Sequence, residues 1–325
     1  MRKQRVFLRT GRKNRFGDCV ILKKIDRKRH PPMMYTVVLL GISILFAVSN
    51  NLLLHRLGDR TLQGRGEVFL FQTAVTAVWI VILSLLNRGW SISAEAWGWG
   101  SLYGVLTAAF LLCKMKAMST GPASVTAFIG SSSMLISAGF GLLYFREPFS
   151  AWQTVGAVLL IGALCLSTVD FSHGDKAQRT WGVYSSLFFV FSGATGILFK
   201  LHQNSSDREE IDGMMLAAAI TATVLFSALS LGFGYREKRA LPKLPKSAAA
   251  ISILCGIVSC GYNRLNIRLS GLLPGTVFFP VFNGCVIFLT ALATAAVFRE
   301  KITKRRLVGI LCGIAALVLI SGGIG

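Results

Sequence analysis

The chain has 325 residues, of which 53% are hydrophobic and 15% are charged, and its mean hydropathy is +0.59. This composition is too apolar for an ordinary soluble protein, and the charges fall in short breaks between long apolar runs, so it predicts a polytopic membrane protein. The net charge of +21 does not indicate nucleic-acid binding, because 12 of the 35 basic residues lie in the first 29 positions and most others flank apolar segments.

Residues 1–33 form a basic tail that contains Pro31 and Pro32 near its end. No apolar run follows the charges before these prolines, so the tail is not a signal peptide. Two interpretations remain open. The tail is either a cytoplasmic arm close to anionic lipid, or an over-extended start upstream of a true initiator at Met33 or Met34.

Ten apolar segments follow, each long enough to cross a hydrocarbon core of about 30 Å as a helix. They cover about 34–54, 67–86, 97–118, 122–145, 150–169, 181–201, 211–234, 247–267, 274–298 and 304–323. A polar link from Asp170 to Thr180 divides them into five plus five. The sequence therefore predicts an all-α integral membrane protein with ten transmembrane helices.

One short stretch occurs twice and indicates a duplication. Phe145-Arg146-Glu147 and Phe298-Arg299-Glu300 each precede an apolar helix, and an offset of 153 residues aligns nine identities in 22 positions without a gap. We therefore expect two five-helix repeats, 34–169 and 181–323. Because five is odd, the second repeat enters the membrane from the opposite side, which makes the repeats inverted in topology.

The charges of the loops and of the tail disagree about orientation. Odd-numbered loops carry 17 basic residues and even-numbered loops carry six, which places the N-terminus outside, whereas the 12 basic residues of the tail favour the inside. A tail of this charge is hard to translocate, so the preferred prediction has both termini in the cytoplasm.

The repeated stretch is interpreted as structural. Ser150 and Gln153 have the spacing of a capping box with Pro148 just upstream, and Thr303 occupies the corresponding cap position. Glu147 and Glu300 stand just before helix starts, where a negative charge favours the helix dipole, so we expect both to shape turns. Small residues that let membrane helices approach closely are Gly156, Gly309 and Gly313.

Polar side chains inside the predicted spans are the candidates for solute contacts. Amides and hydroxyls at this depth are costly unless they are paired or face a wet cavity, and hydrogen bonds between helices are the alternative explanation. The candidates are Asn50, Asn51, Gln72, Ser132 and Asn283. Pro280, one turn before Asn283, is expected to kink its helix and to free a carbonyl.

Two basic residues are candidate partners for an anionic solute group. Lys114 and Arg264 lie on the third helix of each repeat, and Tyr262 and Asn263 stand beside Arg264. Other basic residues near span ends, such as Lys200, are expected to snorkel towards the interface. The acidic residues lie at the edges of the spans, so a midplane carboxylate relay is not supported.

Enzyme signatures and cofactor sites are not indicated. The four histidines have no carboxylate or cysteine at ligand spacing, and the seven cysteines match no metal pattern. Nucleotide-binding and hydrolase motifs are also lacking, so we expect no metal, no cofactor and no enzyme activity.

The repeated pattern resembles the drug/metabolite transporter superfamily, in particular its ten-helix EamA-type members. Phe145-Arg146-Glu147-Pro148-x-Ser150, Phe298-Arg299-Glu300-Lys301-x-Thr303 and the run Pro274-Gly275-x-x-Phe278-Phe279-Pro280 carry the likeness, which extends over about residues 34–323. The resemblance implies a plasma-membrane carrier, often an exporter, of small organic metabolites. Likeness to the family's nucleotide-sugar branches is weaker, because only one of Asn263 and Arg264 is basic.

Three functions are therefore considered. The first is a carrier of polar or anionic metabolites that works by alternating access around a central polar cavity. The second is an exporter of amphipathic or lipid-linked compounds, which would use the aromatic residues Trp79, Phe278, Phe279 and Phe282. The third is a non-transporting membrane scaffold. The expected partners are a small solute and the lipid bilayer, while a monomer and a homodimer both remain open.

Overall fold

The computed structural model describes residues 32–62, 64–87, 92–168, 179–236, 243–299 and 303–321. The first 31 residues of the tail, most of the link between the predicted repeats, and Glu300 lie outside this part of the chain. The helices in it are α2 (Met33–Thr61), α3 (Arg65–Leu86), α4 (Ala94–Thr120), α5 (Ala123–Ser132), α6 (Met134–Tyr144), α7 (Ala151–Thr168), α8 (Arg179–Gln203), α9 (Ile211–Arg236), α10 (Lys246–Leu272), α11 (Gly275–Phe298) and α12 (Lys304–Ser321).

Eight candidate membrane spans occur in the described residues, compared with the ten that the sequence predicted. The two remaining helices, α7 and α12, have 18 residues each and close the predicted halves. The apolar part of α7 is limited to Ala151–Leu166, and α12 begins with Lys304, Arg305 and Arg306. The apolar part of α7 is thus shorter than the eight candidate spans, and α12 carries three basic residues in its first turn. The protein is nevertheless all-helical and multi-pass over the described residues.

The fourth predicted span is broken in the middle, which the sequence did not indicate. Helix α5 ends at Ser132 and α6 begins at Met134, although together they form one candidate span, Val125–Tyr144. Between them, the Ser133 hydroxyl lies 2.6 Å from Gly130 O and 2.6 Å from Ser192 Oγ on α8. A serine side chain that binds a carbonyl of its own preceding turn competes with the helical backbone, so the break coincides with this hydroxyl.

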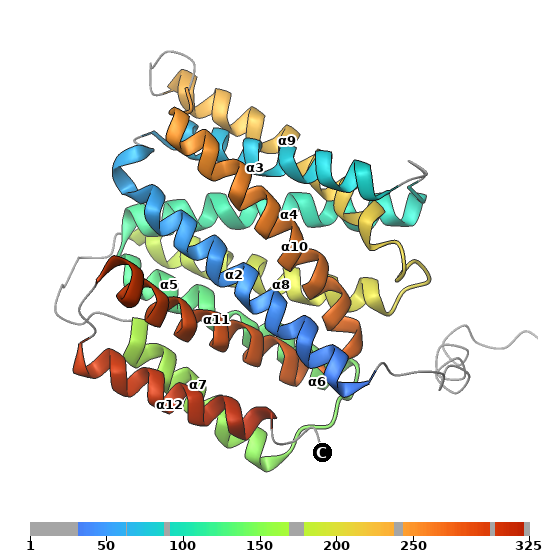
Figure 1. Cartoon of the computed structure of the whole chain (residues 1–325), viewed down its shortest axis with the longest axis vertical. Helices are drawn as coiled ribbons and strands as arrows, with labels where there is room; N and C mark the ends of the chain where they lie inside the picture. The colour runs from blue at the N-terminus through green and yellow to red at the C-terminus, as the bar shows by residue number, and fades with distance from the viewer. Residues whose placement is uncertain are drawn as a thin grey trace, which may run out of the picture.

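The most extensive helix contacts join the first five-helix segment to the second. Helix α7 packs on α12, α3 and α4 on α9, α2 on α10, and α4 on α8. Figure 1 shows α7 and α12 together at one end of the bundle and α3 with α9 at the other. Because the two segments interlock in this way, neither forms a separately packed unit.

Three predicted glycines lie at close helix contacts. A Cβ atom on Gly156 would lie 3.0 Å from Ala316 O, so this glycine lets α7 approach the backbone of α12. On α12, Gly309 is buried, and a Cβ on Gly313 would lie 2.0 Å from the ring of Phe288. Small residues at these positions permit the short distance between α7, α11 and α12.

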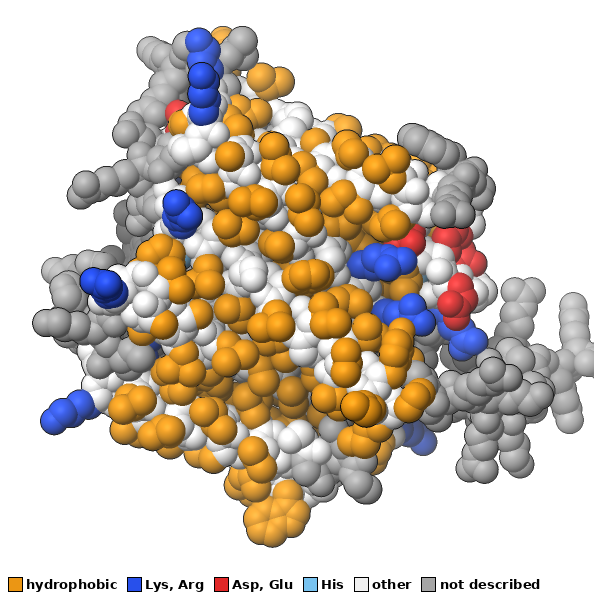
Figure 2. Space-filling model, in the orientation of Figure 1, with side chains coloured by type: hydrophobic (Ala, Val, Ile, Leu, Met, Phe, Trp, Pro, Cys, Tyr) orange, Lys and Arg blue, Asp and Glu red, His pale blue; other side chains and the backbone are white. Residues whose placement is uncertain are grey.

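The outside of the bundle is apolar. Large hydrophobic side chains such as Leu143, Val158 and Val318 are 80%, 65% and 64% exposed. Figure 2 shows hydrophobic side chains over the middle of one face, with Lys, Arg, Asp and Glu mainly near the edges where helices end. This distribution is what a lipid bilayer requires of a protein that spans it.

The two copies of the repeated stretch share a local conformation. Arg146 and Arg299 have φ angles of 51° and 56°, and no other described non-glycine residue has a positive φ. After the first turn, Ser150 N donates to Gln153 Oε1 at 2.8 Å and Gln153 N donates to Ser150 Oγ at 3.2 Å, which completes a capping box. After the second turn, Arg306 N donates to Thr303 Oγ1 at 3.3 Å. Each closing helix therefore begins with a side-chain cap.

Candidate functional site

Of the two predicted cations, Lys114 is the one without a polar partner among the described residues. It lies half-buried on α4, six residues before the end of that helix, and no described residue forms an ion pair or hydrogen bond with its ammonium group. An ammonium group within a membrane span is costly unless it finds a counter-charge or water. Lys114 is therefore a cation that no described side chain neutralises.

Arg264, the other predicted cation, is already neutralised. Its guanidinium donates to both carboxylate oxygens of Asp212, at 2.5 and 2.9 Å. The Arg264 and Asp212 side chains are 45% and 25% exposed. Tyr103 on α4 contacts Asn263, the neighbour of Arg264, and Lys114 lies 11 residues further along α4, so about 16 Å of helix separates its level from that of Arg264. The structure does not bring the two predicted cations together.

Asn263 takes part in a contact between two helices. Tyr103 on α4 donates its hydroxyl to Asn263 Oδ1 on α10 at 2.9 Å, and Asn263 Nδ2 donates to Ser259 O at 2.9 Å. Tyr262 is half-buried beside it and packs against the largest hydrophobic cluster. Tyr103 was not among the residues predicted from the sequence, although a tyrosine hydroxyl inside the predicted span 97–118 could have indicated a polar contact.

The predicted amides on α2 and α3 are half-buried. Asn51 Nδ2 donates to Thr290 Oγ1 on α11 at 3.2 Å, so one of the two neighbouring asparagines joins α2 to α11. The side chains of Asn50 and Gln72 form no hydrogen bond with a described residue. Asn51 is thus engaged between helices, whereas the side chains of Asn50 and Gln72 are not engaged by any described residue.

The remaining predicted polar residues bind their own helices. The Ser132 hydroxyl donates to Phe128 O at 2.9 Å, and Asn283 Nδ2 donates to Phe279 O at 2.9 Å, in the turn that contains Pro280. These bonds satisfy the side chains locally and do not by themselves form a site.

Glu147 forms a contact that the sequence reading did not foresee. Its carboxylate lies 2.6 Å from Lys200 Nζ, and the two side chains are 10% and 7% exposed. It also accepts from Thr276 N at 3.1 Å, at the start of α11. Glu147 was expected to favour the dipole of the helix that follows it, but the N-terminus it contacts belongs to α11. Lys200 was expected to snorkel to the interface, but it is buried against Glu147.

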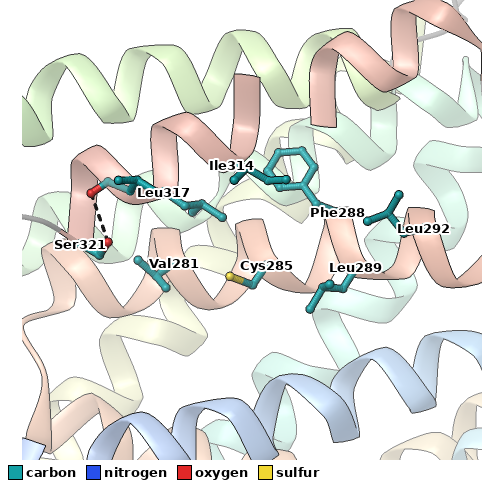
Figure 3. A pocket seen from close by; sticks show the side chains of 9 residues that line it. Val281, Cys285, Phe288, Leu289, Leu292, Ile314, Leu317 and Ser321 are labelled. Carbon is teal, nitrogen blue, oxygen red and sulfur yellow. Dashed lines mark hydrogen bonds between the residues drawn. The ribbon is translucent and has the colours of Figure 1, made fainter. Parts of the chain in front are cut away.

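A shallow apolar pocket of about 300 Å³ lies between α11 and α12 (Figure 3). Its lining includes Cys285, Phe288 and Leu317, and the exposed Leu289 and Val318 open it to the outside of the bundle. It contains none of the nine predicted solute-binding residues. Such a lining suits hydrocarbon and offers little to a charged solute.

The cysteines and other potential ligands form no metal centre among the described residues. Cys113, Cys165, Cys255, Cys260, Cys285 and Cys312 are free, and no cluster of three or more His, Cys, Asp or Glu side chains in this part of the chain could hold an ion.

The helical fold, the apolar surface and the spans define a multi-pass membrane protein. Comparison with protein families makes the class specific: residues 38–169 match the EamA-like transporter family. Residues 38–169 therefore form an EamA-like region of a multi-pass membrane protein.

The fold recurs in solved structures. A crystal structure of a protein that is 13% identical in sequence aligns with a TM-score of 0.63, covering 88% of this chain and 96% of the other. At this identity, the likeness extends to the fold alone. Among curated proteins, none matches the sequence.

Proposed function

We propose that the protein carries small polar or anionic organic solutes across the membrane by alternating access. The observation that carries this proposal is Lys114, a half-buried cation in a membrane span with no polar partner among the described residues. A charged hydrogen bond to a carboxylate or phosphate group is worth roughly 1.5–3 kcal/mol, which is enough to select anionic solutes. Asn50 and Gln72 supply amides that can orient the rest of the solute.

The proposed mechanism uses two inverted five-helix repeats, 34–169 and 181–323, that rock around a central polar site. The pairing of helices supports it. In the proposed repeats α2 corresponds to α8 and α4 corresponds to α10, and the structure pairs α2 with α10 and α4 with α8. Exchanging each helix for its counterpart five spans away converts the first contact into the second. The shared left-handed conformation of Arg146 and Arg299 also supports a duplication.

We further propose an outward direction of transport, a plasma-membrane location and cytoplasmic termini. The direction and location are what the resemblance to EamA-type carriers implies. The orientation is supported by the 12 basic residues of the tail, which are costly to translocate.

Transport by purified protein in liposomes tests the proposal. A thermal-shift screen of carboxylates, phosphates and neutral metabolites would first select solutes, and flux of those solutes would then be measured. We expect Lys114→Gln to reduce flux of the anionic solutes by about tenfold or more, since one charged hydrogen bond is lost. The matched control is Lys116→Gln, two residues further along the same helix, which should leave flux within about twofold of the unaltered protein.

The apolar pocket between α11 and α12 favours a second candidate function, the export of amphipathic compounds. The aromatic residues first considered for that role do not support it, because Trp79, Phe278, Phe279 and Phe282 are 7%, 1%, 6% and 8% exposed and lie in the packed core. Full export of an amphipathic dye by Lys114→Gln, together with no flux of any anionic solute, would favour this second function over the first.

A further inference from the structure

We propose that the ion pair between Glu147 and Lys200 is a gate that closes the two halves of the protein against each other at the face where α2 begins and α12 ends. The inference rests on the proposed alternating-access function and adds to it the residues that hold one face shut. Nothing in the repeated motif or in the family match assigns this role to either residue.

The gate is built from both halves. Glu147 belongs to the turn between α6 and α7 in the first half, and Lys200 is near the end of α8 in the second. Lys200 Nζ also donates to Leu273 O at 2.9 Å, and Glu147 accepts from Thr276 N at 3.1 Å. One carboxylate therefore connects the α6–α7 turn to α8 and to the α10–α11 turn.

Two glycines leave room for the Glu147 carboxylate. A Cβ on Gly141 would lie 2.6 Å from Glu147 Oε2, and one on Gly275 would lie 3.4 Å from the same atom. On the other side, the ring of Phe145 lies 5.8 Å from Lys200 Nζ, within the range of a cation–π contact. The pair is thus enclosed by backbone and aromatic surface.

Burial makes this pair a two-state contact. Glu147 and Lys200 are 10% and 7% exposed, and separating them leaves each charge buried and unpaired unless water reaches it. The face is therefore either closed with the charges paired, or open with both charges hydrated. Partial separation is unfavourable, which is the property that a gate requires.

A neighbouring ion pair provides the contrast. Asp212 and Arg264 lie on α9 and α10, near the same face, but both belong to the second half and are 25% and 45% exposed. Their separation moves neither half relative to the other. This pair is a matched control with the same charges at the same end of the bundle.

Hydrogen–deuterium exchange of the full-length protein in lipid nanodiscs tests the gate without any solute. Glu147→Gln and Lys200→Met each leave one buried charge that must reach water, so we expect backbone amides of residues 275–279 and 145–150 to exchange about tenfold faster. Amides at the opposite face, around Thr126, should be unchanged. The double variant Glu147→Gln/Lys200→Met removes both charges and should return exchange close to that of the unaltered protein.

Asp212→Asn and Arg264→Met are the controls and should not alter exchange at residues 275–279. Should a single variant fail to fold, Glu147→Asp keeps the charge but shortens the side chain by one methylene, and about threefold faster exchange is expected. Unchanged exchange at residues 275–279, equal acceleration at both faces, or the same effect from Arg264→Met would each overturn the gate.

The gate and the proposed function fail in different ways. If the single variants exchange faster at one face but the protein moves no solute in liposomes, the closing contact is supported and the transport proposal is contradicted. If the protein moves solute but exchange in the single variants is unaltered, the transport proposal is supported and the gate is contradicted.

Discussion

Arg146 and Arg299 lie 153 positions apart and both adopt the left-handed backbone conformation, with φ angles of 51° and 56°. Arg146 follows Phe145, the first residue after α6, and Arg299 follows Phe298, the last residue of α11; each precedes the capped start of the next helix. A non-glycine residue in this conformation costs roughly 1–2 kcal/mol. The same uncommon turn thus occurs at both copies of the repeated stretch.

Replacing Arg146 with glycine should stabilise the protein by up to about 1 kcal/mol, because relief of the steric cost of positive φ, about 1–2 kcal/mol, exceeds the entropic cost of glycine, about 0.5–1 kcal/mol. Arg146→Val should destabilise it, since a β-branched residue is less compatible with this conformation. Thermal unfolding in detergent measures both changes. The control is Arg268→Gly within α10, where glycine should lower the stability by up to about 1 kcal/mol. A similar loss from Arg146→Gly would contradict the role of the turn.

Removal of one member of the Glu147–Lys200 pair should be strongly destabilising. We expect Lys200→Met alone to lower the free energy of unfolding by roughly 3–5 kcal/mol, because Glu147 would remain buried and charged. The double variant Glu147→Gln/Lys200→Met should lie within about 1 kcal/mol of the unaltered protein. Chemical denaturation in a double-mutant cycle measures the coupling. Additive effects of the two single changes would show that the residues do not act as a pair.

Two glycines on α4 should respond in opposite ways to alanine. A Cβ on Gly100 would lie 2.3 Å from Met214 O on α9, so Gly100→Ala should force the helices apart and cost about 1–3 kcal/mol. A Cβ on Gly98 would meet nothing within 4 Å, and Gly98→Ala should gain up to about 1 kcal/mol from helix propensity. The apparent melting temperatures of the two variants provide the comparison, and equal shifts would refute close α4–α9 contact at Gly100.

Arg264→Gln should have little effect on transport. Its guanidinium is committed to Asp212 and is 45% exposed, and exposed ion pairs contribute about 0–1 kcal/mol. We expect flux within about twofold of the unaltered protein in the liposome assay, in contrast to the loss expected for Lys114→Gln. A tenfold loss from Arg264→Gln would indicate that Arg264 releases Asp212 and binds the solute.

Local features of the chain were accessible to sequence reasoning. The spacing of Ser150 and Gln153 predicted a capping box, and both of its hydrogen bonds are present because a cap depends on residues three apart. The break at Ser133 was missed. Its hydroxyl also contacts Ser192 on α8, and apolar periodicity along a single span carries no information about such a partner.

The sequence by itself determined that the protein is apolar, helical and multi-pass, because length and hydropathy are properties of the chain, and its repeated stretch predicted an internal duplication. Tertiary structure alone decided how its charges are used. Lys200 and Arg264 both looked like basic residues near span ends, yet one is buried against Glu147 and the other is paired with Asp212 near the surface. Lys114 has neither kind of partner among the described residues. The reason is physical: the free energy of a charge in a membrane span depends on what the fold places beside it, and those neighbours come from distant parts of the chain.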